Sequence, residues 1–280
     1  MQNPLVTALY VYPVKSMKGI ALSSAVLTSK GLQHDRSWMV VAPDGRFVTQ
    51  RNEPRLGLVH TRLEAQGVVL ELDGHGSVTL PYEAVAGDGI STQVWGDACE
   101  TVDQGPAVSE WLTRAIGSPV TLRVVRMAPG FTRPQTQPER YGQETATDFA
   151  DSAPFLLASE DSLDELNSAL AAQGHRPVPM NRFRPNIVVR GLEPFAEHRL
   201  SGVTGSDWRL KLADPCERCL VTTINQETAL RDSSREPYLT LRRINPAPGP
   251  KPTPAFGQNA LLDKGEGQAI GVGDLLSISF

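Results

Sequence analysis

The stretch Trp38–Thr49, WMVVAPDGRFVT, decides the fold class of this 280-residue chain. Its two apolar, β-branched and aromatic runs, Trp38 to Ala42 and Arg46 to Thr49, are separated by Pro43-Asp44-Gly45. An Asp-Gly step between such runs is a strong signal for a β-hairpin, because these residues tolerate the backbone conformation of a tight turn. The stretch therefore predicts two short antiparallel strands.

The same pattern continues beyond this hairpin. Val68 to Leu72 and Ser77 to Leu80 flank Asp73-Gly74-His75-Gly76, which predicts a second hairpin. Val6 to Val14 is rich in β-branched and aromatic residues, which favours a strand. The strands expected in the second half of the chain are Asn186 to Val189, Trp208 to Leu212, Leu220 to Ile224 and Leu275 to Phe280.

Three segments have helical character instead. Ala107 to Ile116 places five apolar side chains on one face, and Gly117 suits its C-terminal stop. Glu160 to Ala172 has Ser159 as a candidate N-cap and a stripe of leucines. A short third helix is expected to start near Pro237. Many strands, few helices and no βαβ rhythm predict an α+β, mainly β chain with barrel-type sheets.

A long segment without periodicity separates the two halves of the chain. Met127 to Phe149 is rich in Pro, Gln, Thr and Arg, and loops of this length are usually functional or mobile. We expect two β-rich domains, residues 1–126 and residues 127–280, with this loop at their boundary. Pro246 to Pro254, PAPGPKPTP, is expected to be a stiff, extended segment outside the core.

Composition limits the classes of partner. The net charge is −4 and the pI about 5.8, so no global positive field attracts nucleic acid or an anionic membrane. No apolar run approaches the roughly 20 residues of a membrane-spanning helix. The N-terminus lacks the basic and apolar blocks of a signal peptide, and three cysteines are few for a disulfide framework. We expect a cytoplasmic protein without nucleic-acid or membrane partners.

The segment Pro215–Thr223, PCERCLVTT, holds two cysteines with two residues between them. A structural zinc site needs four ligands, usually in paired spacings, and the five histidines offer no second close pair. A dithiol redox pair normally lies at a helix N-terminus, whereas the following LVTTI is β-branched and strand-like. A single thiolate, favoured by the adjacent Arg218, is a natural ligand for a soft or high-valent metal. Two cysteines packed as small apolar side chains are an open alternative.

Short polar clusters stand at the edges of several predicted strands. Lysine supplies a point charge, serine a short donor and arginine a planar bidentate fork, which together suit a phosphate or sulfate group. Each cluster alone is typical of a solvated surface, and composition does not show that the clusters converge. The clusters are Lys15-Ser16, Asp35-Arg36, Arg51 with Arg55, Asp151-Ser152 and Arg184-Pro185-Asn186.

Several separated motifs resemble the MOSC family, named for the C-terminal part of molybdenum-cofactor sulfurase. The resemblance covers nearly the whole chain in order, and within the family it is greatest to the amidoxime-reducing group. The motifs similar to the N-terminal β-barrel domain are YPVKSMKGIAL (Tyr12–Leu22), GLQHDRSWMVV (Gly31–Val41) and FVTQRNEPRL (Phe47–Leu56). Those similar to the MOSC domain itself are DSAPFLLASEDSLDELN (Asp151–Asn167), RFRPNIVV (Arg182–Val189), CERCLVTT (Cys216–Thr223) and FGQNALL (Phe256–Leu262).

The resemblance implies a molybdopterin-type molybdenum cofactor. It makes Cys219 the molybdenum ligand and catalytic residue. It also implies that one hydroxyl is missing at Ala153, so that one hydrogen bond to the cofactor is lost or is supplied by Asp151. The cofactor-binding residues that it implies are Lys15, Ser16, Arg36, Asp151, Ser152, Arg184, Asn186 and Cys219.

The resemblance also implies a reaction, the reduction of N-hydroxylated compounds such as amidoximes, hydroxylamines and N-hydroxy nucleobases. The N–OH oxygen is expected to leave at molybdenum, and two electrons and two protons yield the amine or amidine and water. No C-x₄-C-x₂-C run is present, so we expect a separate iron–sulfur, flavin or haem protein as electron donor. The alternative is a non-enzymatic carrier of the cofactor, or of persulfide sulfur on Cys219 or Cys216. Pyridoxal phosphate binding is not expected.

Overall fold

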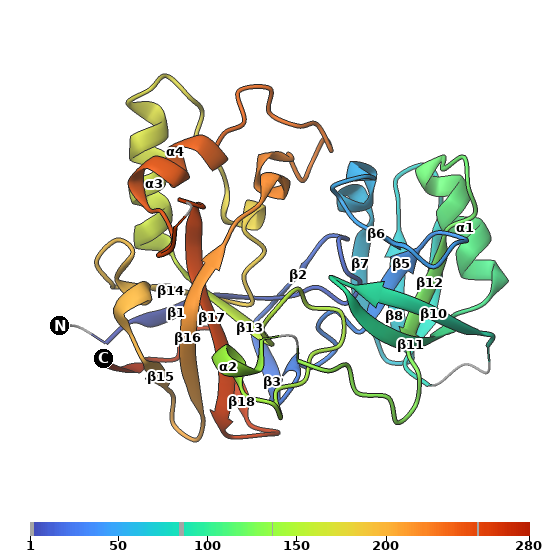
Figure 1. The fold of residues 1–280 in the computed structure, drawn as a ribbon, viewed down its shortest axis with the longest axis horizontal. Helices are drawn as coiled ribbons and strands as arrows, with labels where there is room; N and C mark the ends of the chain where they lie inside the picture. Colours follow the sequence, from blue (N-terminus) through green and yellow to red (C-terminus); the bar gives the residue numbers. More distant parts are fainter. Residues whose placement is uncertain (1–2, 84–86, 136, 251) are drawn as a thin grey trace.

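The computed structural model describes residues 3–83, 87–135, 137–250 and 252–280. Its chain forms two lobes, with both termini on the lobe that carries α3 and α4 (Figure 1). Within the described residues it is mainly strands with few helices, as the sequence predicted, although four α-helices form where three were expected. The helices are α1 (Pro106–Ile116), α2 (Pro138–Tyr141), α3 (Glu160–Ala171) and α4 (Tyr238–Ile244).

The larger sheet has eight strands and belongs to the lobe that holds the termini. It includes the first two strands of the chain, so the N-terminal segment is built into the sheet of the second half. In sheet order its strands are β19 (Ser277–Ser279), β15 (Gly202–Thr204), β16 (Arg209–Glu217), β17 (Ala255–Lys264), β13 (Phe155–Ser159), β14 (Ile187–Arg190), β1 (Leu5–Val11) and β2 (Ile20–Leu22).

Three smaller sheets complete the described chain. The five-stranded sheet contains the predicted hairpin, with Val41 opposite Phe47. Its strands, in order, are β10 (Gly89–Val94), β11 (Asp97–Asp103), β12 (Arg123–Met127), β5 (Trp38–Val41) and β6 (Phe47–Val48). One three-stranded sheet contains, in order, β18 (Ala269–Gly271), β3 (Ser24–Thr28) and β4 (Gly31–Leu32). The other contains β7 (His60–Glu64), β8 (Gly67–Glu71) and β9 (Ser77–Pro81).

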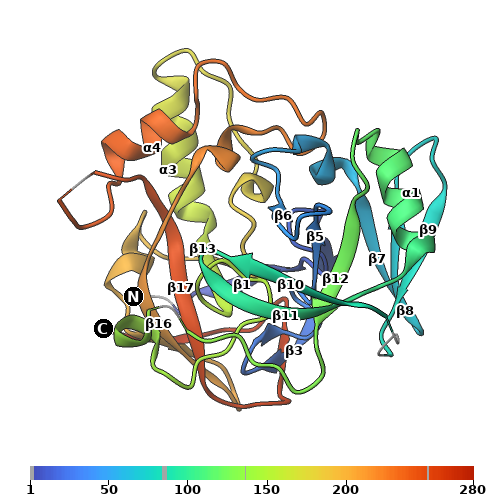
Figure 2. The same ribbon diagram turned by 45° about the vertical axis from the view of Figure 1, so that its right-hand side comes forward.

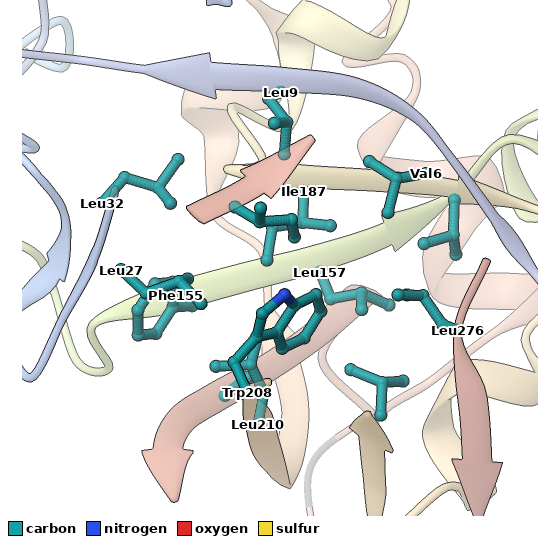
Figure 3. Close-up of a cluster of buried hydrophobic side chains, with 14 of the residues drawn as sticks. Val6, Leu9, Leu27, Leu32, Phe155, Leu157, Ile187, Trp208, Leu210 and Leu276 are labelled. Atoms are coloured by element: carbon teal, nitrogen blue, oxygen red, sulfur yellow. The ribbon is translucent and has the colours of Figure 1, made fainter. Parts of the chain in front are cut away.

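Each lobe has its own hydrophobic core. In the larger lobe Trp208, Phe155 and Leu157 pack among aliphatic side chains of β1, β14 and β16 (Figure 3). In the smaller lobe the predicted apolar face of α1 packs on β5 and β12, with Trp111 and Leu112 buried. Since a fully buried aliphatic or aromatic side chain contributes roughly 1.5–3 kcal/mol, each core stabilises its own lobe.

The predicted helices form with the expected ends. Gly117 closes α1 in the left-handed conformation, with φ 64°. The Ser159 side chain caps α3 by accepting from the backbone N–H of Asp161 at 3.1 Å. The third helix predicted from the sequence corresponds to α4, which begins at Tyr238, directly after Pro237. No helix in the described segments is long and apolar enough to cross a membrane.

Three expectations about local structure are wrong. Leu220–Thr223 forms a 3₁₀ turn, not a strand. The 127–149 segment contains the short helix α2. The chain also contains one βαβ unit, because β13 and β14 pair in parallel across α3. The sequence does not reveal this unit, because a long irregular connection, residues 172 to 186, separates α3 from β14.

A substitution at Gly31 tests how closely the N-terminal strands approach the larger sheet. It has φ +124°, and a Cβ there would lie 2.7 Å from the carbonyl oxygen of Pro154, just before β13. Gly31→Ala is therefore expected to lower the free energy of unfolding by about 3 kcal/mol, from backbone strain and overpacking together. Gly74 is the matched control, because its φ is also positive, +77°, but a Cβ would meet nothing within 4 Å. Gly74→Ala should cost about 1 kcal/mol by urea unfolding; equal losses would contradict the close approach.

Candidate active site

A pocket of about 200 Å³ lies where the ends of several strands meet. Three polar segments, the one after β1 and those before β13 and β14, reach it because β13 and β14 are parallel and β1 is antiparallel to β14, so that these ends share one edge of the sheet. All of the site residues predicted from the sequence line this pocket. They are Lys15, Ser16, Arg36, Asp151, Ser152, Arg184, Asn186 and Cys219.

Two arginines, Arg36 and Arg184, form one cationic group of the pocket. The guanidinium groups of Arg36 and Arg184 lie 4.4 and 4.2 Å from the centre of the Tyr12 ring. Arg36 pairs with the buried Asp35 and donates to Asn186 Oδ1 at 3.2 Å. The Asn186 amide in turn accepts from a backbone N–H and donates to a backbone carbonyl. Arg36 is therefore fixed by partners on three segments of the chain.

Arg184 is less completely satisfied. Its Nη1 donates to the carbonyl of Met17 at 2.8 Å, but its Nη2 is buried without a hydrogen-bond partner in the described part of the chain. Removal of water lowers the pKa of Arg184 to about 10 and raises that of the buried Tyr12 to about 12. A buried donor without a partner is costly, so the pocket is suited to an anion that would accept this bond.

Lys15, Asp151 and Trp95 form a second group. The buried Lys15 ammonium donates to the carbonyl of Phe149 at 2.7 Å and pairs with Asp151. Asp151 Oδ1 also accepts from the indole N–H of Trp95 at 3.0 Å. Burial lowers the pKa of Lys15. Loss of water opposes the ionisation of Asp151, but Lys15 and Trp95 outweigh it and hold the pKa of Asp151 well below its usual range.

The missing hydroxyl at residue 153 is not replaced by Asp151. Ala153 is buried at the pocket wall, and Ser152 beside it is partly exposed. An ionised carboxylate only accepts hydrogen bonds, and Asp151 already accepts from Lys15 and Trp95. The side chain of Asp151 therefore offers no donor to an anion, and Ser152 is the hydroxyl that this segment supplies.

The two cysteines of the CxxC segment contact different arginines. Cys219 Sγ lies 3.1 Å from Nη2 of Arg51. Arg218, which was expected to favour the thiolate of the working sulfur, lies instead 2.8 Å from Cys216 Sγ and also donates to the carbonyl of Phe183. Burial raises the pKa of Cys216 despite Arg218. The pair is thus asymmetric in its partners: Cys216 contacts Arg218, and Cys219 is the sulfur that faces a different cation, Arg51.

Backbone strain is concentrated at this pocket. Ser16, Arg36 and Arg184 have φ of 72°, 46° and 54°, a region that residues with a Cβ seldom adopt. Trp95, which contacts the pocket, has φ 54°. Such conformations cost free energy and persist where the surrounding structure enforces them, often at functional sites. Three of the predicted anion-binding side chains are therefore aimed by strained backbone.

Sequence reasoning missed part of the site. Arg51 was recognised as a polar residue after the hairpin, but its contact with Cys219 was not predicted. Arg55, predicted in the same cluster, pairs with Glu53 and does not line the pocket. Trp95 carried no sequence signal beyond its size. Other polar lining residues that were not predicted include Gln50, Arg182 and Asn259.

The donor set of the pocket fits the cofactor that the motifs implied. One partly exposed sulfur faces a group of cations, and two buried arginine nitrogens, Arg184 Nη2 and Arg218 Nε, lack partners among the described residues. A phosphate-bearing ligand would satisfy such donors, and a thiolate suits a molybdenum centre. All three cysteines are free, and the described residues contain no cluster of three or more His, Cys, Asp or Glu suited to a metal.

The Lys15–Asp151 pair predicts a pH dependence of stability. Because the folded-state pKa of Asp151 is depressed, its ionised form stabilises the fold above the unfolded pKa near 4, and that contribution is lost as the pH falls further. Asp151 is half exposed, so solvent screening reduces the gain to about 1 kcal/mol. Asp151→Asn should therefore be less stable than the wild type at pH 7 and equal to it near pH 2. A constant difference in urea unfolding across this range would contradict the ion pair.

Comparison with known proteins gives two family matches. A model described as the MOSC N-terminal beta barrel domain matches residues 3–119, and one described as the MOSC domain matches residues 144–277. The chain is 32% identical over 270 residues to mitochondrial amidoxime-reducing component 1 of Homo sapiens, covering 92% of this chain and 78% of that protein. It is 34% identical over 245 residues to mitochondrial amidoxime reducing component 2 of Rattus norvegicus, covering 85% and 71%. It is 31% identical to molybdenum cofactor sulfurase of Danio rerio, covering 84% of this chain and 30% of that protein.

Proposed function

This chain belongs to the MOSC family, and from that premise we propose that it is a molybdenum-cofactor-dependent reductase of N-hydroxylated compounds. The names of its relatives support a function related to the molybdenum cofactor. The observation that carries the finer proposal is the convergence of Lys15, Ser16, Arg36 and Arg184 on one pocket that Cys219 also lines. A pocket of this kind holds an anionic group firmly and leaves one protein sulfur for a metal.

Some residues of the pocket would bind the anionic part of the cofactor, and one would ligate the metal. When bound, the cofactor would supply two-electron removal of an oxygen atom from the substrate N–OH. Arg36 and Arg184 would neutralise the phosphate, and their contacts with Tyr12 and Asn186 fix the orientation of both guanidinium groups. Cys219 would be the protein ligand of the metal, with Arg51 beside its sulfur. Since these groups are already held in place, binding requires little reorganisation of the pocket.

The proposed reaction balances with an external source of electrons. An amidoxime, two electrons and two protons give an amidine and one water, and a hydroxylamine gives an amine and water. The described residues contain three free cysteines and no cluster of three or more His, Cys, Asp or Glu that could hold a metal. We therefore propose a separate iron–sulfur, flavin or haem protein as the donor, and a small N-hydroxylated molecule as the substrate.

A second candidate function is a carrier of the cofactor or of persulfide sulfur. The similarity to molybdenum cofactor sulfurase and the presence of two thiols, Cys216 and Cys219, in one pocket favour it. Both functions need the same pocket, but they differ in catalysis. A reductase turns over substrate many times, whereas a carrier binds and releases its cargo once.

Turnover separates the two candidates. Protein produced in a cofactor-competent host is supplied with benzamidoxime and a reduced artificial dye, and benzamidine is measured against time. We expect many molecules of benzamidine per chain, with two electrons taken from the reduced dye for each benzamidine formed. Release of pterin to an apo-acceptor without any benzamidine would support the carrier and contradict the reductase.

A further inference from the structure

Trp95 occupies an unusual position at the tip of the β10–β11 hairpin. Val94 and Asp97 form the last pair of the ladder, so Trp95 and Gly96 make a two-residue turn, with φ of 54° and 101°. Turns with positive φ at both positions strongly favour asparagine or glycine at the first. A bulky indole in this position is unfavourable for the turn itself, which points to a role outside the hairpin.

The tip of this hairpin reaches from its own lobe toward β13 of the other (Figure 2). There the Trp95 ring meets three partners. Arg51 lies 4.4 Å above the ring, Phe47 packs edge-on at 5.3 Å between centroids, and the indole N–H donates to Asp151 at 3.0 Å. Even so, 47% of the residue is exposed. Trp95 thus separates the candidate active site from the surface on the opposite side of the indole ring.

The other side is a second and larger groove. It has a volume of about 750 Å³, which is within the range of small-molecule sites. Trp95, Phe47 and Phe131 supply aromatic surface, and the polar side chains Asp44 and Arg46 on its lining pair with each other. Such a groove suits a planar ring, because aromatic faces bind rings by stacking. Glu100, also on the lining, is an exposed carboxylate without an ion pair among the described residues.

The groove adjoins the candidate active site through a single layer of side chains. Arg51 links the two, since its guanidinium lies between the Trp95 ring and Cys219 Sγ, 3.1 Å away. Its neighbour Asn52 faces the groove. A ligand with its ring against Trp95 would therefore be separated from the Cys219 sulfur by the side chains of Trp95 and Arg51.

We propose that this groove binds planar aromatic molecules, with Trp95 and Phe131 as the residues that determine its affinity. Resting on the proposed function, we infer that the ring is the body of an aromatic N-hydroxylated substrate whose N–OH group extends past Trp95 toward Cys219.

Binding to cofactor-free protein tests the groove independently of any reductase activity. The probe is benzamide, an uncharged ring that cannot be reduced, observed by saturation-transfer NMR in 10 mM phosphate, which occupies the cationic pocket. We expect saturable binding with a dissociation constant on the order of 1 mM. Trp95→Asn, the residue that the turn prefers, and Phe131→Ala should each weaken binding at least tenfold. Phe280→Ala, which removes an exposed ring at the C-terminus, should not change it.

Two results would overturn the groove as an aromatic site. One is unchanged affinity in both Trp95→Asn and Phe131→Ala, with circular dichroism showing that both are folded. The other is binding of benzamide in phosphate-free buffer that disappears in 10 mM phosphate, which would put the probe in the cationic pocket.

A second experiment tests the substrate role in the loaded enzyme. Benzamidoxime is compared with acetamidoxime, which has the same reactive group without the ring. The ratio of their kcat/KM values should fall about tenfold in Phe131→Ala, chiefly through a higher KM for benzamidoxime. An unchanged ratio would contradict the substrate role while the NMR result stands by itself, and absence of turnover in the wild type would count against the proposed function instead.

Discussion

Replacing Cys219 by alanine is expected to lower kcat for benzamidoxime reduction by at least about a thousandfold while leaving the fold intact. The reason is that this sulfur is the one that the pocket leaves for a metal, whereas the cations that hold the anionic part of the cofactor remain. The side chain is partly exposed and outside the hydrophobic cores, so its removal creates no buried cavity. Steady-state kinetics and circular dichroism measure the two effects.

Cys216→Ala is the matched control, because this thiol lines the same pocket three residues earlier. Burial raises its pKa and its sulfur contacts Arg218 rather than Arg51, so we expect its role to be structural. We expect a loss of activity below about tenfold. If the two variants lost activity equally, the asymmetry of the pair would be wrong, and full activity of Cys219→Ala would contradict its assignment as ligand.

Replacing Arg36 by alanine is expected to lower the free energy of unfolding by about 3–5 kcal/mol. Its partner Asp35 has a side chain that is only 1% exposed. Truncation of Arg36 would leave that carboxylate buried with the backbone N–H of Tyr12 as its remaining hydrogen-bond partner, at 2.9 Å. An uncompensated buried charge is among the largest single-residue penalties in a folded protein. Urea unfolding of the cofactor-free protein measures the loss.

Arg46→Ala is the control for this effect. Arg46 also pairs with a nearby aspartate, Asp44, but both side chains are largely exposed, at 84% and 51%. Exposed pairs contribute at most about 1 kcal/mol because water screens them. A loss for Arg36→Ala no greater than that for Arg46→Ala would show that the Asp35–Arg36 pair is not desolvated.

Local signals in the sequence predicted most of the secondary structure. The hairpin at Asp44-Gly45 and the ends of α1 and α3 depend on residues within a few positions, and these were correct. The 220–224 segment was not, because its β-branched residues favoured a strand. In the structure Thr222 and Thr223 donate instead to the carbonyls three residues earlier, at 3.0 and 2.7 Å, which satisfies the turn locally.

The candidate site could be predicted in its residues but not in its contacts. Lys15, Arg36 and Arg184 were recognised by their motifs. Strand pairing brings Lys15 and Arg184 to one edge of the larger sheet, and Arg36 joins them through its backbone N–H, which donates to the carbonyl of Tyr12 at 2.8 Å. The contacts of Arg51 with Cys219 and of Trp95 with Asp151 join positions 168 and 56 residues apart, for which the sequence contains no local signal. They follow only from how the two lobes are packed together.

The central claim is that this pocket holds molybdenum through Cys219. Metal content, determined by inductively coupled plasma mass spectrometry on protein from a cofactor-competent host, tests it most directly. We predict close to one molybdenum per chain, retained through gel filtration, with zinc at background. Zinc bound in place of molybdenum, or the absence of molybdenum from folded protein, would contradict the account.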